Sequence, residues 1–121
     1  LMVQHKAPHR DWSPAPKYLD LYDDITFPEP DTLFDDYTGR GSAARDQDMT
    51  IEKSMLLGSD LKVDAFYTNR YNRMNEEQIK MFKAAYLKEN QYLKEQQLTG
   101  NDLVSWKYQR YLKDYLRCVK W

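Results

Sequence analysis

The sequence predicts an α/β protein in which this chain supplies mostly α-helical and irregular structure with one short strand. Three observations lead to this class. The chain opens with an apolar run, Leu1-Met2-Val3, that leads directly into a polar loop containing three prolines. Residues 75–121 repeat apolar side chains with the period of an α-helix. The region between them, 17–74, has scattered apolar residues without a sustained period, which predicts an irregular cover segment.

The first half of the chain is predicted to contain a strand, a loop and short helical turns. Residues 1–4 are interpreted as a short buried strand that enters a loop ending at residue 16. Residues 23–41 are predicted to form an ordered loop, because proline and glycine punctuate it while apolar side chains give it contacts. Short helical turns are predicted at 16–22 with Pro16 in the first position, at 42–45 with Ser42 as N-cap, and at 50–57 closed by Gly58.

The second half, 75–121, is predicted to be a helical hairpin. Asn75 precedes two glutamates, which is favourable for an N-cap and for the helix dipole. A first helix is expected to reach about residue 97, and Gly100 lies in the break before the second. The first helix has an apolar stripe at Ile79, Phe82, Tyr86 and Leu93, and the second an apolar face at Tyr108, Tyr111, Leu112, Tyr115, Leu116 and Val119.

Composition excludes several function classes. The net charge is −1, from 18 basic and 19 acidic residues, so no global field attracts nucleic acid or an anionic membrane. The length suits one domain, and we identify neither a membrane-spanning apolar run nor a signal peptide pattern in it. Cys118 is the single cysteine and therefore cannot form an internal disulfide. These observations leave a globular domain whose chemistry depends on local motifs.

The two ends of the sequence predict that it belongs to a longer polypeptide. The chain begins at Leu1 inside the predicted strand and stops at Trp121 inside the predicted helix. Domain boundaries usually fall in polar linkers, and a lone strand needs neighbouring strands for stability. We therefore expect an internal segment of a longer protein, which is called the parent protein below.

The loop after the predicted strand concentrates side chains that can carry chemistry. Pro8 restricts the residue before it to extended geometry and so directs His9. The segment Lys6-Ala7-Pro8-His9-Arg10-Asp11-Trp12-Ser13-Pro14-Ala15-Pro16-Lys17-Tyr18 resembles the internal histidine segment of sulfatases of the alkaline-phosphatase-like superfamily. It is most similar to those acting on sulfated sugars, of the N-acetylglucosamine-6-sulfatase and mucin-desulfating types. The resemblance continues through 22–24, 28–37 and 43–45, is loose over 54–105, and resumes over 108–120.

The resemblance implies the fold and the setting of the parent protein. The expected parent fold is the α/β alkaline-phosphatase-like sandwich, with calcium as cofactor and a formylglycine nucleophile, in a periplasmic or secreted enzyme. The expected partners are a sulfated sugar substrate and the remainder of the parent catalytic domain, with neither nucleic acid nor a membrane. A sulfuric ester hydrolase of carbohydrates is thus the predicted function, with an N-acetylglucosamine-6-sulfate type favoured.

The resemblance also implies roles for individual side chains. His9 would be the catalytic histidine, in contact with the sulfate or with the leaving-group oxygen. An imidazole, with a reference pKa near 6.5, can donate a proton to an alkoxide at neutral pH. Lys6 and Arg10 would bind the sulfate or another anionic group of the substrate, and Trp12 would stack on a sugar ring. Two alternatives stay open: His9 forms only a surface hydrogen bond, and Trp12 packs beneath the loop. His5 receives no role.

Other residues that suggest chemistry are given a structural interpretation. The nucleophile motif of these enzymes is Cys/Ser-x-Pro-x-Arg, and Val119-Lys120-Trp121 after Cys118 do not match it. Cys118 is therefore predicted to be a buried structural thiol. The acidic pairs at 23–24 and 35–36 are predicted to be solvated loop residues that form turns. The resemblance places the calcium ligands of the family in other segments. No metal site is assigned within this chain, and the chain alone is predicted to be inactive.

Two other functions compete with the sulfatase. A helical interaction module would use the tyrosine-rich face of the hairpin to bind a partner or to dimerise. It explains the second half of the chain but not the loop around His9. A phosphoester hydrolase of the same superfamily would use a serine or threonine nucleophile and two metal ions.

Overall fold

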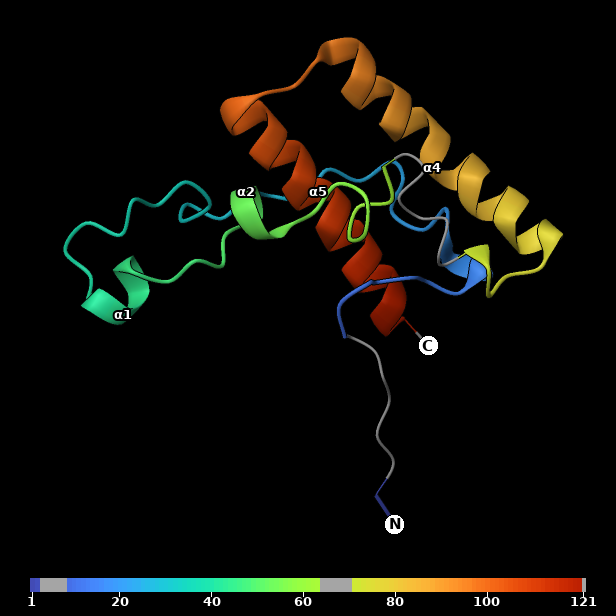
Figure 1. Cartoon of the computed structure of the whole chain (residues 1–121), viewed down its shortest axis with the longest axis horizontal. Helices are drawn as coiled ribbons and strands as arrows, with labels where there is room; N and C mark the ends of the chain where they lie inside the picture. The colour runs from blue at the N-terminus through green and yellow to red at the C-terminus, as the bar shows by residue number, and fades with distance from the viewer. Residues whose placement is uncertain (3–8, 64–70, 121) are drawn as a thin grey trace.

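The structure, a computed structural model, describes residues 1–2, 9–63 and 71–120. Figure 1 shows two long helices that run in roughly opposite directions, with the first half of the chain winding past them. The helices are η1 (Pro16–Tyr18), α1 (Ser42–Arg45), α2 (Ile51–Ser54), α4 (Glu76–Gln96) and α5 (Gly100–Val119). None of the helices in the described part of the chain is long and apolar enough to cross a membrane.

The described residues contain no strand. The predicted strand at 1–4 lies partly outside them, because residues 3–8 are not described. Leu1 and Met2 are described, and both are exposed rather than buried. A strand is stabilised by hydrogen bonds to a neighbouring strand, and the described residues offer none. The mostly helical and irregular character predicted for the chain is confirmed.

Helix α4 forms as the sequence predicts, because its N-terminus carries a complete capping box. The side chain of Asn75 accepts a hydrogen bond from the Gln78 amide at 2.8 Å, and the Gln78 side chain accepts one from the Asn75 amide at 3.0 Å. These two bonds satisfy amides that a helix start would leave without partners. Of the predicted stripe, Phe82, Tyr86 and Leu93 are buried and Ile79 is half-buried, so the inward face is confirmed with Ile79 at its margin.

Helix α5 begins at Gly100, which was predicted to lie in the break before it. The face that α5 buries is not the predicted one. The apolar positions 108, 111, 112, 115 and 116 are only half-buried, and Val119 is exposed. The side that is buried carries Val104 together with the charged residues Lys107, Arg110, Lys113, Asp114 and Arg117. Burial of charge is costly unless each charge has a partner. The prediction failed because the partners come from distant segments that the helical period does not reveal.

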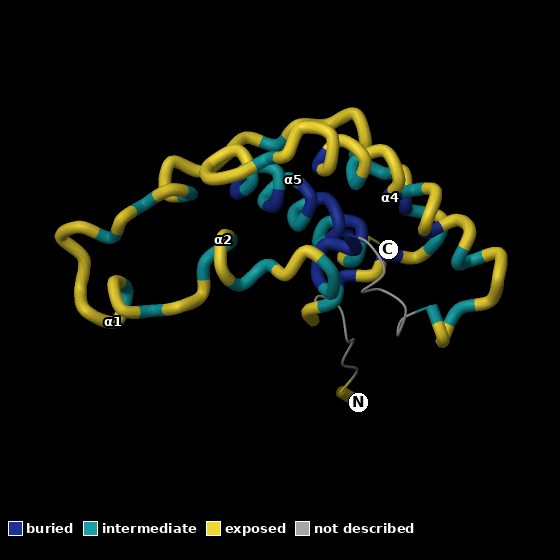
Figure 2. The backbone as a smooth tube through the Cα atoms, turned by 45° about the horizontal axis from the view of Figure 1, so that its top comes forward, coloured by how far each residue is buried: buried dark blue, intermediate teal, exposed yellow. Residues whose placement is uncertain are grey.

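The segment 60–63 fills the space between the two long helices. The side chain of Asn90 on α4 donates to the carbonyl of Lys62 at 2.9 Å, and Arg110 on α5 donates to the carbonyl of Leu61 at 3.2 Å. The hairpin is therefore an open one with a third segment inside it. Two small apolar clusters result, one of Leu19, Phe82 and Tyr86, the other of Leu61, Val63 and Leu93. Figure 2 shows the buried residues gathered here and along α5, with the loop around α1 exposed.

The short helices follow their predicted positions with corrections at their ends. Pro16 begins η1, as its fixed φ favours, but η1 ends at Tyr18 and does not extend to residue 22. Helix α1 has Gly41 as its N-cap, one residue before the predicted Ser42. Helix α2 begins as predicted after Thr50 but ends at Ser54 instead of reaching Gly58. The amide of Leu56 instead donates to the buried carboxylate of Asp60, four residues further on, at 2.8 Å, and this bond is incompatible with continuing the helix to Gly58.

The loop at 23–41 is attached to α5 by polar contacts. The side chain of Gln109 bonds both the amide and the carbonyl of Phe27, at 2.9 and 2.8 Å. Within the loop the carboxylates of Asp35 and Asp36 accept from the amide two residues further on, at 2.9 and 2.8 Å. The predicted turn-forming role of this acidic pair is confirmed.

Candidate functional site

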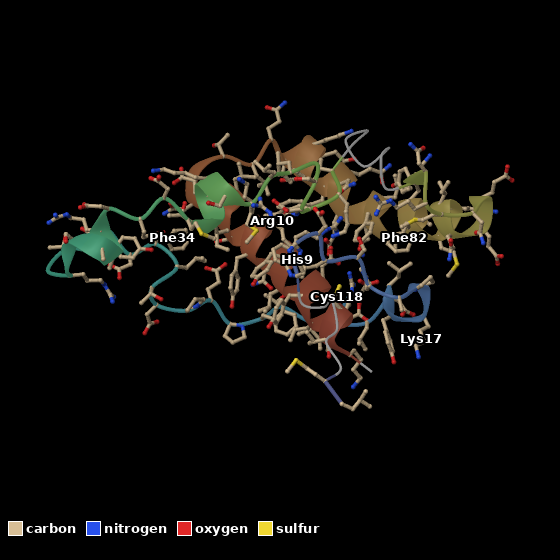
Figure 3. The ribbon with its side chains drawn as sticks, turned by 60° about the horizontal axis from the view of Figure 1, so that its bottom comes forward. His9, Arg10, Lys17, Phe34, Phe82 and Cys118 are labelled. Atoms are coloured by element: carbon tan, nitrogen blue, oxygen red, sulfur yellow. The ribbon has the colours of Figure 1, made fainter. Side chains whose placement is uncertain are left out.

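The candidate site is the histidine turn, residues 9–12, at the start of the second described range. Figure 3 shows His9 and Arg10 near the middle of the molecule, with Lys17 and Phe34 toward its ends. His9 is exposed, and its Nδ1 lies 3.1 Å from the carbonyl oxygen of Arg10. A carbonyl oxygen only accepts, so the contact requires the proton on Nδ1 and leaves Nε2 as the nitrogen that can exchange a proton with a substrate.

Arg10 is held by an ion pair with Asp60, fifty residues further along the chain. Its Nε and Nη2 donate to the two carboxylate oxygens at 2.7 and 2.6 Å, and Nη2 also donates to the Ser54 carbonyl at 2.6 Å. The hydrogen bond to Asp60 raises the pKa of Arg10. Burial acts to raise the pKa of Asp60, but the bonds from Arg10 and from the Leu56 amide outweigh it, and the pKa is lowered. The fork of Arg10 is thus directed at Asp60.

Trp12 fixes the other end of the histidine turn. Its side chain is 8% exposed and packs edge-on against Tyr111 of α5, with ring centroids 4.7 Å apart. This contact supports the packing alternative for Trp12. Asp11, between Arg10 and Trp12, has a φ of 69°, a left-handed conformation that costs a non-glycine residue free energy. The anchors on either side hold the turn in this shape.

The structure brings three of the four predicted site residues into one turn. His9 is presented outward, whereas Arg10 and Trp12 face other parts of the chain. Lys6, the fourth, lies outside the described residues, as does His5. An open cavity of about 510 Å³ lies beside the turn, and Ser54 and Tyr111 belong to its lining. His9, Arg10 and Trp12 do not belong to the lining of this cavity.

A buried charge network connects the histidine turn to the two long helices. Lys62 donates to the carbonyl of Asp60 at 3.0 Å and to the carboxylate of Asp114 at 2.7 Å. The other oxygen of Asp114 accepts from Arg117 at 3.2 Å and from the Tyr86 hydroxyl at 3.1 Å. Burial lowers the pKa of Lys62 although Asp114 opposes the shift, and burial raises the pKa of Tyr86.

A second part of the network joins α4 to α5. The carboxylate of Glu89 accepts from Arg110 and, at 3.0 Å, from Lys113. Burial acts to raise the pKa of Glu89, but the positive charges of Arg110 and Lys113 outweigh it, and the pKa is lowered from 4.5. Arg117 in turn donates to the Asp23 carboxylate at 2.5 Å, so one predicted turn residue is instead part of an ion pair.

The lowered pKa of Glu89 predicts that the helical hairpin loses stability in acid. A carboxylate with a folded pKa below its unfolded value contributes stability above the unfolded pKa, and this contribution is lost as the pH falls through the folded pKa. In the parent protein, the urea midpoint should therefore fall below pH 4.5 more steeply than in a Glu89→Gln variant. Glu95→Gln, on an exposed position of α4, is the matched control and should keep the original slope. Urea midpoints that fall equally with pH in all three proteins would contradict this role of Glu89.

The structure supports a structural interpretation of Cys118. The thiol is half-buried, and burial raises its pKa from 9.0 to about 11. The described residues contain no group of three or more His, Cys, Asp or Glu side chains that could hold a metal ion. A thiol with a raised pKa forms little thiolate at neutral pH, which fits a structural role for Cys118.

The raised pKa predicts slow alkylation of Cys118. A pKa that is higher by two units lowers the fraction of thiolate at pH 8 about a hundredfold. A more basic thiolate is also about tenfold more nucleophilic, which offsets part of the loss in rate. The pKa effect alone should slow iodoacetamide labelling in the folded parent protein about tenfold relative to the protein in urea. Peptide mass spectrometry at Cys118 measures this. Equal rates in the two states would contradict the burial described here.

Sequence reasoning missed the residues that hold the turn and the helices together. Asp60 and Lys62 lie where the sequence shows no period, and nothing there marked them as buried. On α5, the charged residues at 107, 110, 114 and 117 recur at helical spacing, which is a signal for a second face. Charges of mixed sign on a helix are usually exposed, so this spacing by itself does not identify a buried face.

No family model matches this chain, whereas comparisons with curated proteins and with solved structures find similar proteins. The chain is 44% identical over 131 aligned residues to an N-acetylglucosamine-6-O-sulfatase of Bacteroides thetaiotaomicron, covering 98% of this chain and 23% of that protein. It is also similar to the solved structure of BT4656 in complex with its substrate D-glucosamine-2-N,6-O-disulfate. That match has a TM-score of 0.86 and 42% identity, and covers 94% of this chain and 25% of the other. The chain thus spans about a quarter of the length of these relatives.

Proposed function

From the premise that this chain is homologous to sulfatases over almost its whole length, we propose that it is a segment of a sulfatase catalytic domain. The observation that carries the proposal is the 44% identity over 98% of the chain. The parent protein then hydrolyses sulfate esters of carbohydrates and acts like an N-acetylglucosamine-6-sulfatase. The substrate class is supported by the similar structure, which contains a 6-O-sulfated glucosamine.

The proposed role of His9 is to donate a proton to the oxygen that leaves with the sugar. A sugar alkoxide is a poor leaving group, so proton transfer to the bridging oxygen lowers the barrier. The contact from Nδ1 to the Arg10 carbonyl sets the ring so that Nε2 is the donating nitrogen of the imidazolium. Lys6 remains a proposed ligand of the sulfate. Trp12 has a proposed role in supporting the turn from beneath, since it is buried against Tyr111.

The remaining chemistry is proposed to come from other segments of the parent protein. A formylglycine would supply the nucleophile, and calcium would stabilise negative charge on the sulfate. The part of the chain that the structure describes has no group of three or more potential metal ligands, and the sequence lacks the motif for the nucleophile. We further propose a periplasmic or secreted location. The chain alone is expected to release no sulfate.

The experiment is an assay of free sulfate released by the parent protein from a panel of sulfated monosaccharides. The panel contains glucosamine and N-acetylglucosamine 6-sulfates, the corresponding 3-sulfates and galactose 6-sulfate, with glucosamine 6-phosphate as the control for phosphoester chemistry. We expect release from the 6-sulfated glucosamines and none from the phosphate ester. Release of phosphate without sulfate would favour the phosphoester hydrolase. No release from any ester, by protein with verified formylglycine and calcium, would reject the proposal for monosaccharide substrates.

A further inference from the structure

We propose that Arg10 and Asp60 are positioning residues that hold the His9 imidazole in its productive orientation. The inference rests on the proposed function, because it assigns the ion pair to the proton donor of that reaction. It also differs from the expectation that Arg10 binds the sulfate. The pair acts on the substrate only through His9 and is in this sense not catalytic.

The first argument is the path of contacts from Asp60 to the imidazole. The His9 ring is oriented by the carbonyl oxygen of Arg10, at 3.1 Å from Nδ1. That carbonyl belongs to a residue whose side chain is fixed by two bonds of 2.7 and 2.6 Å to Asp60 and by one to Ser54. A bidentate guanidinium–carboxylate pair restrains direction as well as distance. Rotation of residue 10 would move the acceptor of the His9 hydrogen bond.

The second argument is the contrast in burial between the two partners. The Asp60 side chain is 0% exposed and the Arg10 side chain is 48% exposed. Asp60 therefore belongs to the rigid interior and Arg10 reaches inward to it from the surface. Burial of a carboxylate costs free energy unless a positive charge is paired with it. The ion pair with Asp60 is therefore favoured, and it holds the Arg10 side chain in place.

The third argument is that Asp60 is itself immobilised. Its carboxylate also accepts from the amide of Leu56, and its carbonyl accepts from Lys62, which is paired with Asp114 of α5. The turn is fixed at its other end by Trp12 against α5. Both anchors of the turn are therefore connected to α5, one through Lys62 and Asp114 and the other through direct packing of Trp12. The left-handed φ of Asp11 shows a conformation that these anchors must maintain.

The alternative is that Arg10 binds the sulfate directly, and kinetics separate the two roles. A sulfate ligand contributes to substrate binding, so its loss raises KM. In that case substitution of Asp60 would change the kinetic constants little. A positioning pair contributes to the geometry of proton transfer, and a misplacement of about 1 Å can cost about a hundredfold in rate. Loss of either partner then lowers kcat.

The experiment measures kcat and KM of the parent protein on the best 6-sulfated glucosamine for Arg10→Lys, Arg10→Gln, Asp60→Asn and the double variant Arg10→Gln/Asp60→Asn. We expect each single variant to lose about 10- to 100-fold in kcat, with KM within about threefold of the original. Arg10→Lys should not rescue, because lysine has no fork. The double variant should be no worse than the singles, since both remove one interaction.

The control is Arg45→Gln, which removes an exposed arginine from its exposed ion pair with Asp46 and should leave both constants unchanged. If Asp60→Asn fails to fold, the two variants of the half-exposed Arg10 still distinguish a positioning role from sulfate binding. An unchanged kcat in Asp60→Asn, or a rise in KM alone in Arg10→Gln, would overturn the inference while sulfate release by the unsubstituted protein keeps the proposed function. Absence of sulfate release by the unsubstituted protein would reject both.

Discussion

Substitution of His9 by alanine in the parent protein is expected to lower kcat for a 6-sulfated glucosamine by about 10²- to 10⁴-fold. The variant removes the imidazole that is exposed on the histidine turn and oriented through Nδ1 by the Arg10 carbonyl. The leaving oxygen of a sugar would then depart as an alkoxide without a proton. Steady-state release of sulfate, with enzyme and variant compared at the same pH, measures the loss.

An aryl sulfate provides the control for this prediction. A nitrophenolate is a good leaving group and gains little from protonation, so the loss in His9→Ala should be much smaller on 4-nitrophenyl sulfate. His9→Gln can still hydrogen-bond but cannot act as an acid, and it should behave like alanine. Equal losses on the sugar and the aryl ester would contradict proton donation and favour sulfate binding by His9. Full activity on both would mean that His9 forms only a surface hydrogen bond.

Substitution of Asp114 by asparagine is expected to be the most destabilising single change in the helical hairpin. Asp114 is 0% exposed and is paired with Lys62 and Arg117, which are also buried. Removal of its charge takes the buried counter-charge from Lys62 and leaves Arg117 with Asp23 as its charged partner, and breaking a buried ion pair in this way typically costs about 3–5 kcal/mol. The measurement is the urea midpoint of the parent protein together with amide hydrogen exchange in peptides from α4 and α5, which should be accelerated.

The matched control for Asp114→Asn is Asp46→Asn. Asp46 forms an exposed ion pair with Arg45, of a kind that contributes little, so neither the midpoint nor the exchange should change. Adding Lys62→Met to Asp114→Asn removes a cation along with its partner. The loss of unfolding free energy in the double variant should therefore be smaller than the sum of the losses in the two single variants. Additive losses would show that Lys62 and Asp114 are not coupled as the structure describes.

Much of the local structure could be predicted because it depends on neighbouring residues. The start of α4 follows from Asn75 and Gln78, which bond each other three residues apart. The turns at 35–38 follow from aspartates that bond the backbone two residues on. The resemblance to sulfatases, which rests largely on the contiguous residues 6–18, is confirmed by the 44% identity of the chain to an N-acetylglucosamine-6-O-sulfatase.

The candidate site was predictable only in part. Pro8 and the residues around His9 identify the turn, but its anchor Asp60 lies fifty positions away. Nothing near Arg10 in the sequence distinguishes a guanidinium that binds sulfate from one that is paired with a carboxylate. The same holds for Trp12, whose contact with Tyr111 depends on where α5 lies.

The sequence by itself determined where the two long helices form and how α4 is capped, because these depend on contacts within a few residues. Only the tertiary structure decided which face of α5 is buried. Helical period identifies an apolar and a charged face with equal clarity, but burial of the charged face requires counter-charges. Those counter-charges, on Lys62, Glu89 and Asp23, come from separate segments. Since a buried charge is stable only beside its partner, this choice follows from packing and not from pattern.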